Sequence, residues 1–460
     1  MERQLVAYPR REPDQAGEDV RTRNWARNAT LGPAASVSAP RDEEELRTLL
    51  ATTQGGVRVI GSRMSPGRML ALAAQGDILL DLSHFRGLVE LGEDRATFAA
   101  ATTLGEIYAC LSAHGRMLPA APGVISSQTL AGALATGTHG QGLGQSCIPD
   151  AALSVRMVLA DGSVQEFDVE HPWFGAVKLG LGLLGVVTQV TLRTVVSPVY
   201  ACQKAVTSAA TLETDLLTWN RENAMSKAWW FPDQDQVHVW VAQEADGAES
   251  ERWTSGGSVL LEQKTTNAVL NATVDRTLEH MRGDTKILDA DGKPFQTVQR
   301  FKDFSDVTGD VYQVFCRGIA TPQINVEIAV PLASAGRVVT AIKEWHAATR
   351  PHMHYPVILR ATGASDSWLS PSYGQETCFF GFVVYYAEDG SLAEEGVSFL
   401  RAVERVLADE GGRPHWGKYF DETLYDWSTL YPRWGSFRGV RASLDPQRRF
   451  ENAFTAELFA

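Results

Sequence analysis

The stretch from Gly132 to Gly144 constrains the fold of this chain most, because it reads GALATGTHGQGLG and places seven glycine or alanine residues around one Thr-His pair. Residues with little or no side chain let the main chain approach a flat or anionic molecule closely. The stretch therefore indicates a cofactor site. Considered alone, it is also compatible with a tight turn between buried elements.

A second loop supports the cofactor interpretation. The segment Val57–Gly67 reads VRVIGSRMSPG, a β-branched run that breaks into Gly61-Ser62-Arg63. Main-chain N–H groups, a hydroxyl and a guanidinium are the groups that hold a pyrophosphate. The loop contains neither GxGxxG nor GxxxxGK[ST], which disfavours a nicotinamide site of the usual kind and a P-loop.

Composition restricts the class of protein. The chain has 460 residues, 44% hydrophobic and 21% charged, with a net charge of -13. This length predicts more than one domain, and the acidic balance without a basic run argues against nucleic acid or an anionic membrane as a partner. Five widely spaced cysteines without CxxC indicate neither a disulfide framework nor a zinc site, and we expect no metal. Without an apolar leader or an 18-residue apolar run, we expect a cytoplasmic protein with a flexible tail over residues 1–22.

Local signals predict several elements. Carboxylates from Asp42 to Glu45 open a helix that ends at Gly55-Gly56, and Thr103 with Glu106 forms a capping box. We expect a buried strand over 77–82, a hairpin over 155–164, and irregular segments on both sides of the glycine-rich stretch. Beyond residue 198, alternating aromatic residues at 229–231 and 237–240 predict strands. INVEIAVP, residues 324–331, predicts another strand, and we expect a structural role for its Glu327.

Several motifs in order carry a resemblance over nearly the whole chain. They are residues 24–28, the loop at 61–65, ATGTHG, 185–188, 230–232, 359–374, HWGK at 415–418 and 444–446. The chain resembles the aldonolactone oxidase and alditol oxidase branch of the vanillyl-alcohol-oxidase superfamily, the PCMH-type FAD-binding flavoproteins. The resemblance implies an α+β fold with a two-part PCMH-type FAD-binding domain over 23–198 and an antiparallel-sheet substrate (cap) domain over 199–410. Residues 411–460 would return to the FAD-binding domain.

The resemblance also implies site residues. Lys418 and Arg360 match the catalytic cations of the family, and Ile358, Arg360, Gly381 and Trp230 match its substrate pocket. The matching cofactor-binding residues are Ile60, Gly61, Ser62, Arg63, Met64, Ser65, Gly132, Ala133, Thr136, Gly137, His139, Gly140, Gly142, Val186, Val187, His415 and Lys418.

Three positions depart from the family pattern. Met64 stands where the family has the histidine that tethers FAD, and a thioether is a poor nucleophile, so we expect noncovalent FAD. Ile358 replaces the glutamate of Glu-x-Arg, and Gly381 stands where alditol oxidases have a histidine. These changes predict a roomier, more apolar pocket.

The favoured function is therefore FAD-dependent oxidation of a small non-sugar or decorated substrate of specialised metabolism, with O2 or another electron acceptor. The base would then be another residue, such as His139, His352, His354 or Tyr385. Three alternatives stay open: an ordinary D-arabinono-1,4-lactone oxidase-like or alditol oxidase, a flavin-binding protein with little redox activity, and a ligand-binding scaffold of two α+β domains.

Overall fold

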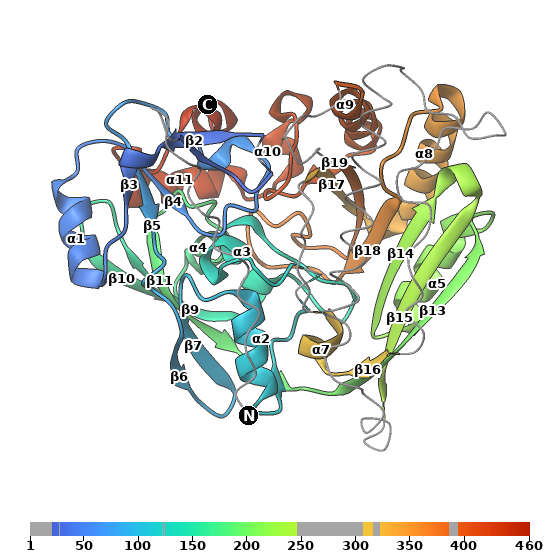
Figure 1. Ribbon diagram of the computed structural model, residues 1–460, viewed down its shortest axis with the longest axis horizontal. Helices are drawn as coiled ribbons and strands as arrows, with labels where there is room; N and C mark the ends of the chain where they lie inside the picture. The colour runs from blue at the N-terminus through green and yellow to red at the C-terminus, as the bar shows by residue number, and fades with distance from the viewer. Residues whose placement is uncertain are drawn as a thin grey trace.

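The computed structural model of this chain describes residues 21–26, 28–121, 123, 125–245, 307–315, 323–385 and 394–460. The expected tail over residues 1–22 lies outside the described residues, except for its last two. In Figure 1 several small sheets occupy one half of the molecule, and an eight-stranded sheet occupies the other half. In the ranges given above, no helix is long and apolar enough to cross a membrane.

The first half is built from short strands and capped helices. Its main sheets are a parallel sheet in the order β3-β5-β4 and an antiparallel sheet in the order β10-β9-β11-β7-β6. Local signals fixed both of its first two helices, because Asp42 accepts a hydrogen bond from the Glu45 N–H and Thr103 forms the expected capping box with Glu106. The elements are β1 Arg21–Arg23, β2 Thr30–Pro33, β3 Val37–Ser38, α1 Glu43–Thr52, β4 Val57–Ile60, β5 Ile78–Asp81, β6 Leu88–Leu91, β7 Arg95–Ala99, α2 Leu104–Ser112, β8 Arg116–Met117, α3 Leu130–Thr136, β9 Ala152–Val158, β10 Val164–Asp168, α4 Phe174–Val177, β11 Val186–Arg193 and β12 Val195–Val196.

The first part of the glycine-rich stretch differs from the sequence prediction, which placed it between irregular segments. Residues Leu130–Thr136 form the helix α3, because Leu130, Ala133 and Leu134 recur on one buried face and Thr129 caps the start. Gly137 ends the helix in the left-handed region at φ 73°. A Cβ at Gly137 would lie 2.8 Å from Leu179 Cδ1, so this position needs a glycine both for its backbone angle and for its close packing.

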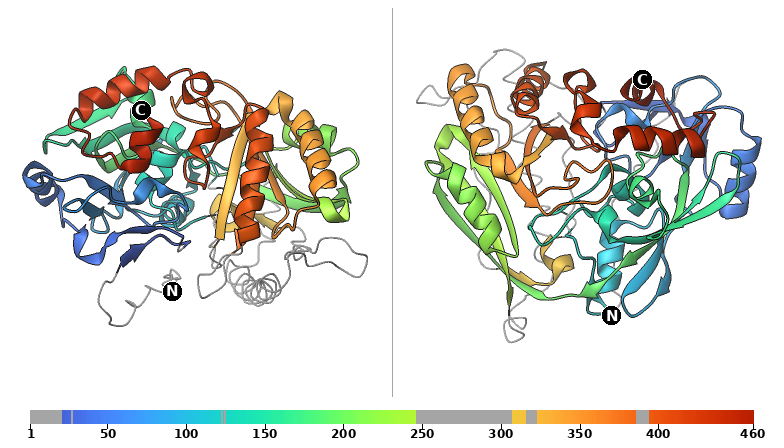
Figure 2. Two further views of the ribbon diagram at one scale, coloured as in Figure 1. Left: turned by 90° about the horizontal axis from the view of Figure 1, so that it is seen from above. Right: turned by 180° about the vertical axis from the view of Figure 1, so that it is seen from behind.

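The second half is a single antiparallel sheet in the order β16-β13-β15-β14-β18-β19-β17-β20. Helices α8 and α9 cover one face of it, where Phe382 of β19 packs on Phe399 of α9 (Figures 1 and 2). Because side chains alternate along a strand, Phe379 and Gly381 of β19 lie on the opposite face, toward the first half. The elements are β13 Val199–Ser208, α5 Leu212–Glu222, β14 Met225–Phe231, β15 Gln236–Ala245, β16 Val307–Gly309, α7 Val311–Phe315, β17 Gln323–Pro331, α8 Ala335–Thr349, β18 Val357–Thr362, β19 Thr377–Tyr385 and α9 Glu394–Asp409.

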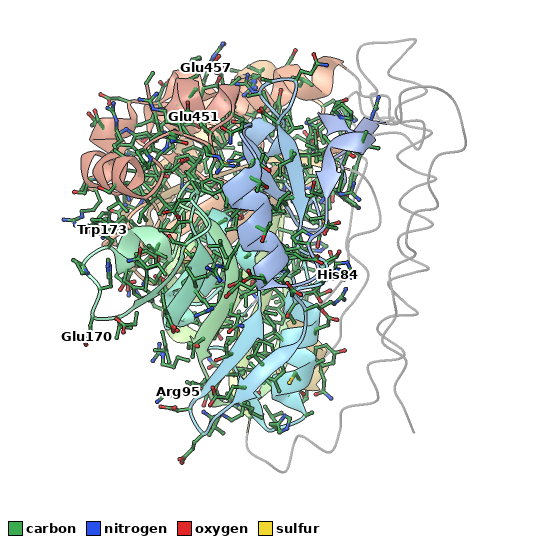
Figure 3. The ribbon with its side chains drawn as sticks, turned by 90° about the vertical axis from the view of Figure 1, so that its left-hand side faces the viewer. His84, Arg95, Glu170, Trp173, Glu451 and Glu457 are labelled. Atoms are coloured by element: carbon green, nitrogen blue, oxygen red, sulfur yellow. The ribbon has the colours of Figure 1, made fainter. Side chains whose placement is uncertain are left out.

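The C-terminal segment joins the two halves. It begins with β20, Arg413–Pro414, on the edge of the large sheet, and then packs its helices on the first half, where Asn452 donates to the carbonyls of Met69 and Ala71. Figure 3 shows this segment, marked by Glu451 and Glu457, above the strands of the first half. Its helices are α10 Trp427–Leu430, α11 Trp434–Leu444 and α12 Ala453–Leu458.

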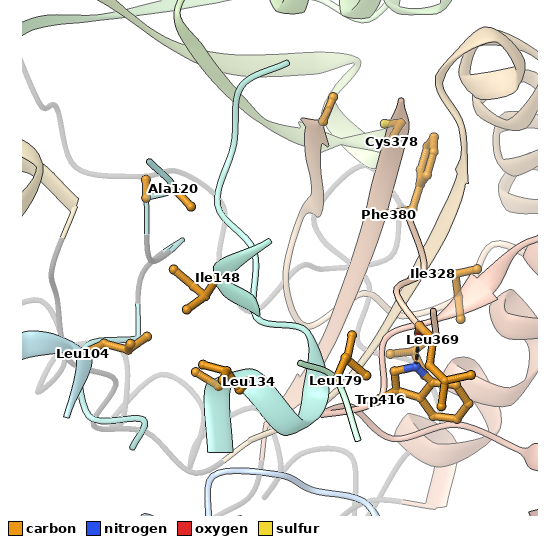
Figure 4. Packing of buried hydrophobic residues seen from close by; sticks show 14 of the residues in the cluster. Leu104, Ala120, Leu134, Ile148, Leu179, Ile328, Leu369, Cys378, Phe380 and Trp416 are labelled. Atoms are coloured by element: carbon orange, nitrogen blue, oxygen red, sulfur yellow. Dashed lines mark hydrogen bonds between the residues drawn. The ribbon is translucent and has the colours of Figure 1, made fainter. Parts of the chain in front are cut away.

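One hydrophobic core runs through the interface between the halves. Figure 4 shows members of this core from both halves: Leu104 and Leu134 from the first half, Ile328 and Phe380 from the large sheet, and Trp416 from the C-terminal segment. The indole N–H of Trp416 donates to the carbonyl of Leu369 at 2.6 Å. The core therefore fixes the segment around Trp416 against both halves.

Candidate active site

A pocket opens where β4, α3 and β11 meet. The sequence-predicted cofactor residues that line it are Ile60, Gly61, Ser62, Arg63, Met64, Ser65, Gly132, Thr136 and Val187. The other predicted cofactor residues do not line this pocket; they are Ala133, Gly137, His139, Gly140, Gly142, Val186, His415 and Lys418.

The residues of this pocket fit a flavin dinucleotide. A Cβ on Gly61 would overlap Thr129 Oγ1, so the loop lies directly against the start of α3. Main chain of this kind can come close to a phosphate. Gly180, Gly182 and Gly185 also line the pocket. The Ser62 hydroxyl donates to the carbonyl of Ser127, which holds the loop in place.

A second group of polar residues lies beside this pocket and is centred on Glu327 of β17. The Glu327 carboxylate pairs with the guanidinium of Arg360, and its Oε2 lies 3.7 Å from Lys418 Nζ. His139 Nε2 lies 3.5 Å from its Oε1. The side chain of Glu327 is only 4% exposed, so we name Glu327, Arg360, Lys418 and His139 the Glu327 cluster.

The structural role expected for Glu327 stays a prediction, and the structure adds its two cationic partners. A charged residue in the middle of an apolar strand is rarely buried without a partner, and INVEIAVP carried that signal. The sequence alone could not identify Arg360 as the partner of Glu327, because Arg360 is 33 positions away along the chain.

The strand register explains how the carboxylate reaches Arg360. Across three neighbouring strands Glu327 pairs with Gly381, and Gly381 pairs with Ile358. Arg360 pairs with Phe379, so the ion pair crosses β19 diagonally next to a residue without a side chain. The expectation of open space at Gly381 is wrong, because Ile358 leans over it and a Cβ there would lie 3.3 Å from Ile358 Cβ.

Two histidines complete the surroundings of the carboxylate. The His139 ring stacks on Phe379 with centroids 3.6 Å apart, and the His415 ring centroid lies 5.4 Å from that of His139. Burial lowers the pKa of His139, with Arg360 adding to the effect and Glu327 opposing it. Burial also holds the pKa of His415 well below its ordinary value. Both imidazoles are therefore neutral at neutral pH.

The charges of the cluster do not cancel. Burial opposes ionisation of Glu327, yet the cations of Arg360 and Lys418 hold its pKa well below the ordinary value. Burial lowers the pKa of Lys418, and Glu327 offsets part of this effect. With Lys418 protonated, two cations share one carboxylate, which leaves one positive charge in excess. His139, Glu327 and His415 are spaced to hold a metal ion, but these two cations already occupy the carboxylate and would repel one.

The cluster adjoins the cofactor pocket through the segment 415–418. A Cβ on Gly417 would lie 3.2 Å from Thr136 Oγ1, and Thr136 lines the pocket. A Cβ on Gly67, just beyond the pocket loop, would lie 3.0 Å from the carbonyl oxygen of Lys418. Lys418 and the pocket are therefore neighbours in space, although Lys418 does not line the pocket itself.

Three of the four candidate bases lie elsewhere. The Tyr385 N–H donates to His354 Nδ1 at 3.2 Å, and the rings of His352 and His354 are 5.2 Å apart. Tyr385 is four residues beyond Gly381 on β19, about 13 Å along the strand. Of the four, His139 belongs to the Glu327 cluster.

The expected place of Trp230 in the substrate pocket is also corrected. On β14 Lys227 pairs with Arg360 and Trp229 pairs with Ile358, so these two side chains share the face of the cluster. Trp230 pairs with Val357 and points to the opposite, helix-covered face. Because Trp229, Trp230 and Phe231 are all aromatic, the sequence does not show which of them faces the site.

Comparison with known proteins decides the family. Residues 190–458 match the family model of D-arabinono-1,4-lactone oxidase, and residues 34–168 match that of an FAD binding domain. The chain belongs to the D-arabinono-1,4-lactone oxidase family. It is an FAD-dependent oxidoreductase, and the expected α+β fold with a PCMH-type FAD-binding domain is confirmed.

Two curated relatives match this chain over nearly their full length. L-gulono-1,4-lactone dehydrogenase of Mycobacterium tuberculosis is 27% identical over 94% of this chain and 97% of the relative. Alditol oxidase of a Streptomyces species is 24% identical over 95% and 98%. Among solved structures, cholesterol oxidase from B. sterolicum is similar in fold, with a TM-score of 0.72 at 15% identity over 99% of both chains.

Proposed function

We propose that this enzyme oxidises a carbinol carbon of a sugar lactone or an alditol. Relatives named for a gulonolactone and for alditols support this substrate class over a decorated substrate of specialised metabolism. The side chain of Ile358 fills the space above Gly381, which removes the main argument for a roomier pocket. Buried hydrogen-bonding groups in the Glu327 cluster suit a substrate with several hydroxyls.

The Glu327 cluster is the observation that carries this proposal. A carboxylate that holds Arg360 and Lys418 fixes two cations beside the cofactor pocket without reorganisation during the reaction. When bound, FAD supplies the redox chemistry by accepting a hydride from the substrate carbon. The excess positive charge of the cluster stabilises negative charge that develops as the substrate is oxidised.

The same cluster supplies a route for the substrate proton. Neutral His139 can accept a proton, and the Glu327 carboxylate 3.5 Å away would stabilise the imidazolium that forms. We therefore assign proton removal to the Glu327–His139 pair, in place of the more distant His352, His354 and Tyr385.

FAD binding is proposed to be noncovalent. Met64 lines the pocket, and its Sδ lies 3.9 Å from the hydroxyl of Ser127. A thioether there does not form the bond that a histidine forms. Acid precipitation of the purified holoenzyme should leave all yellow colour in the supernatant. An intact-chain mass increased by the mass of FAD would contradict this prediction.

A substrate panel tests the proposed function. Holoenzyme is mixed anaerobically with L-gulono-1,4-lactone, D-arabinono-1,4-lactone, xylitol or sorbitol, and the loss of yellow flavin absorbance is followed. We expect at least one of these compounds to bleach the flavin within the dead time or the first seconds. A panel without bleaching, alongside rapid bleaching by an apolar alcohol, would restore the decorated-substrate alternative. Repeating the reaction in air shows whether O2 or another compound accepts the electrons.

A further inference from the structure

Arg58 is a buried cation at the wall of the cofactor pocket. It lies on β4, is 3% exposed, and lines the pocket a few residues before the loop Gly61–Ser65. Its Nη1 donates to the carbonyl of Phe450 and, at 3.5 Å, to the carbonyl of Gly182. Within the described ranges no carboxylate pairs with it, and its Nε has no hydrogen-bond partner.

A buried guanidinium without a counter-charge is costly, because desolvation is not repaid by an ion pair. Burial lowers the pKa of Arg58 to about 10, and the nearby cation of Arg441 adds to the effect. Arg58 therefore stays charged at neutral pH. Arg441 is different, because its guanidinium pairs with Glu451.

The guanidinium of Arg58 is directed toward the pocket. Gly182 lines the same pocket, and a Cβ at Gly182 would lie 3.9 Å from Arg58 Nη2. Among the described residues both hydrogen bonds of Arg58 come from Nη1, so Nη2 and Nε keep their donors for another acceptor. Arg63, at the end of the same strand and loop, lines the pocket as well.

We propose that Arg58 binds the diphosphate of FAD and that the diphosphate supplies the counter-charge that the protein lacks. Of the parts of FAD, the diphosphate alone is anionic, and a guanidinium fork matches two phosphate oxygens. Arg58 of strand β4 and Arg63 of the loop that follows it would then both bind the diphosphate. This assignment rests on cofactor binding and is independent of the proposed substrate.

The test compares binding and stability in protein prepared without flavin. Arg58→Met should weaken FAD and ADP binding about 10-fold or more, the scale of a charge-assisted hydrogen bond. The ratio of ADP to AMP affinity should fall, because AMP lacks the second phosphate. The unfolding temperature of flavin-free Arg58→Met should equal or exceed that of wild type, because an uncompensated buried charge is removed. Arg58→Lys should retain part of the affinity.

Arg449→Met is the matched control. Arg449 also donates to main-chain carbonyls, of Leu50, Ala160 and Thr53, but it does not line the pocket. This variant should lower the unfolding temperature and leave FAD affinity within about twofold. The proposal is overturned if Arg58→Met binds FAD like wild type, if the ADP to AMP ratio is unchanged, or if flavin-free Arg58→Met is destabilised as Arg449→Met is.

Discussion

At the scale of single residues, one carboxylate sets the electrostatics of the active site. Glu327 has the Arg360 and Lys418 cations on one side and the His139 imidazole on the other. Removing its charge without changing its size separates its electrostatic role from its packing role. We therefore expect a neutral substitution at Glu327 to lower the rate of flavin reduction strongly.

We predict that Glu327→Gln slows flavin reduction by the true substrate about 10²-fold, because the charge that holds both cations in place and stabilises protonated His139 is lost. Single-turnover absorbance measures the rate. Glu404→Gln is the control, because Glu404 is also a buried glutamate paired with an arginine, Arg401, and lies on α9 away from the cluster. Equal rates in Glu327→Gln and wild type would remove Glu327 from the mechanism.

At the scale of elements, α3 links the glycine-rich stretch to the cofactor. The helix carries Gly132 and Thr136 to the pocket wall and ends at Gly137. The turn after it leads within two residues to His139 of the Glu327 cluster. A distortion at the C-terminal end of α3 would therefore displace both the cofactor pocket and the Glu327 cluster.

We predict that Gly137→Ala lowers the free energy of unfolding by about 1–3 kcal/mol and weakens FAD binding, because φ is 73° and the new Cβ would meet Leu179. Denaturant titration and FAD titration measure both effects. Gly439→Ala is the control on α11, since a Cβ there meets nothing within 4 Å, and it should be neutral or stabilising by about 1 kcal/mol. Similar results for the two variants would contradict the role given to Gly137.

At the scale of the whole molecule, buried histidines couple folding to pH. Burial lowers the pKa of His354 to about 3 and that of His352 to about 4, the latter against an opposing effect of Asp233. In the unfolded chain a histidine has a pKa of about 6.5. Below that pH, His352 and His354 therefore bind protons in the unfolded chain but stay neutral in the folded chain.

We predict that stability is full above about pH 6.5 and falls toward about pH 4, with a slope of up to about 1.4 kcal/mol per pH unit for each of these rings. Urea titrations at several pH values measure the slope. His352→Leu should flatten it, since neither ring nitrogen of His352 has a partner among the described residues. His84→Gln, at an exposed histidine, is the control (Figure 3). An unchanged slope in His352→Leu would contradict this account.

The parts of the molecule that sequence predicts well are those set by neighbours in the chain. The Asp42 and Thr103 caps, the strand at 57–60 and the loop after it follow from local chemistry. α3, which reads LAGALAT, was missed although its leucine and alanine residues favour a helix, because the glycines within and after it were interpreted as a loop. The Glu327–Arg360 pair depends on the order β18-β19-β17, which no local pattern encodes.

The same limit explains the error at Trp230. Whether Trp229 or Trp230 faces the site is a matter of register between β14 and β18, and a shift of one residue reverses the answer. The space at Gly381 was misjudged for a related reason, because the neighbour that fills it, Ile358, belongs to another strand.

We propose that the cations held by Glu327 beside the cofactor pocket promote the oxidation of a lactone or alditol. The most direct test of this proposal is the rate of anaerobic flavin bleaching in wild type and Lys418→Met, both loaded with FAD, with the best substrate of the panel. We expect Lys418→Met to keep its fold and its FAD and to bleach about 10²-fold more slowly. Bleaching at the wild-type rate would contradict the proposal.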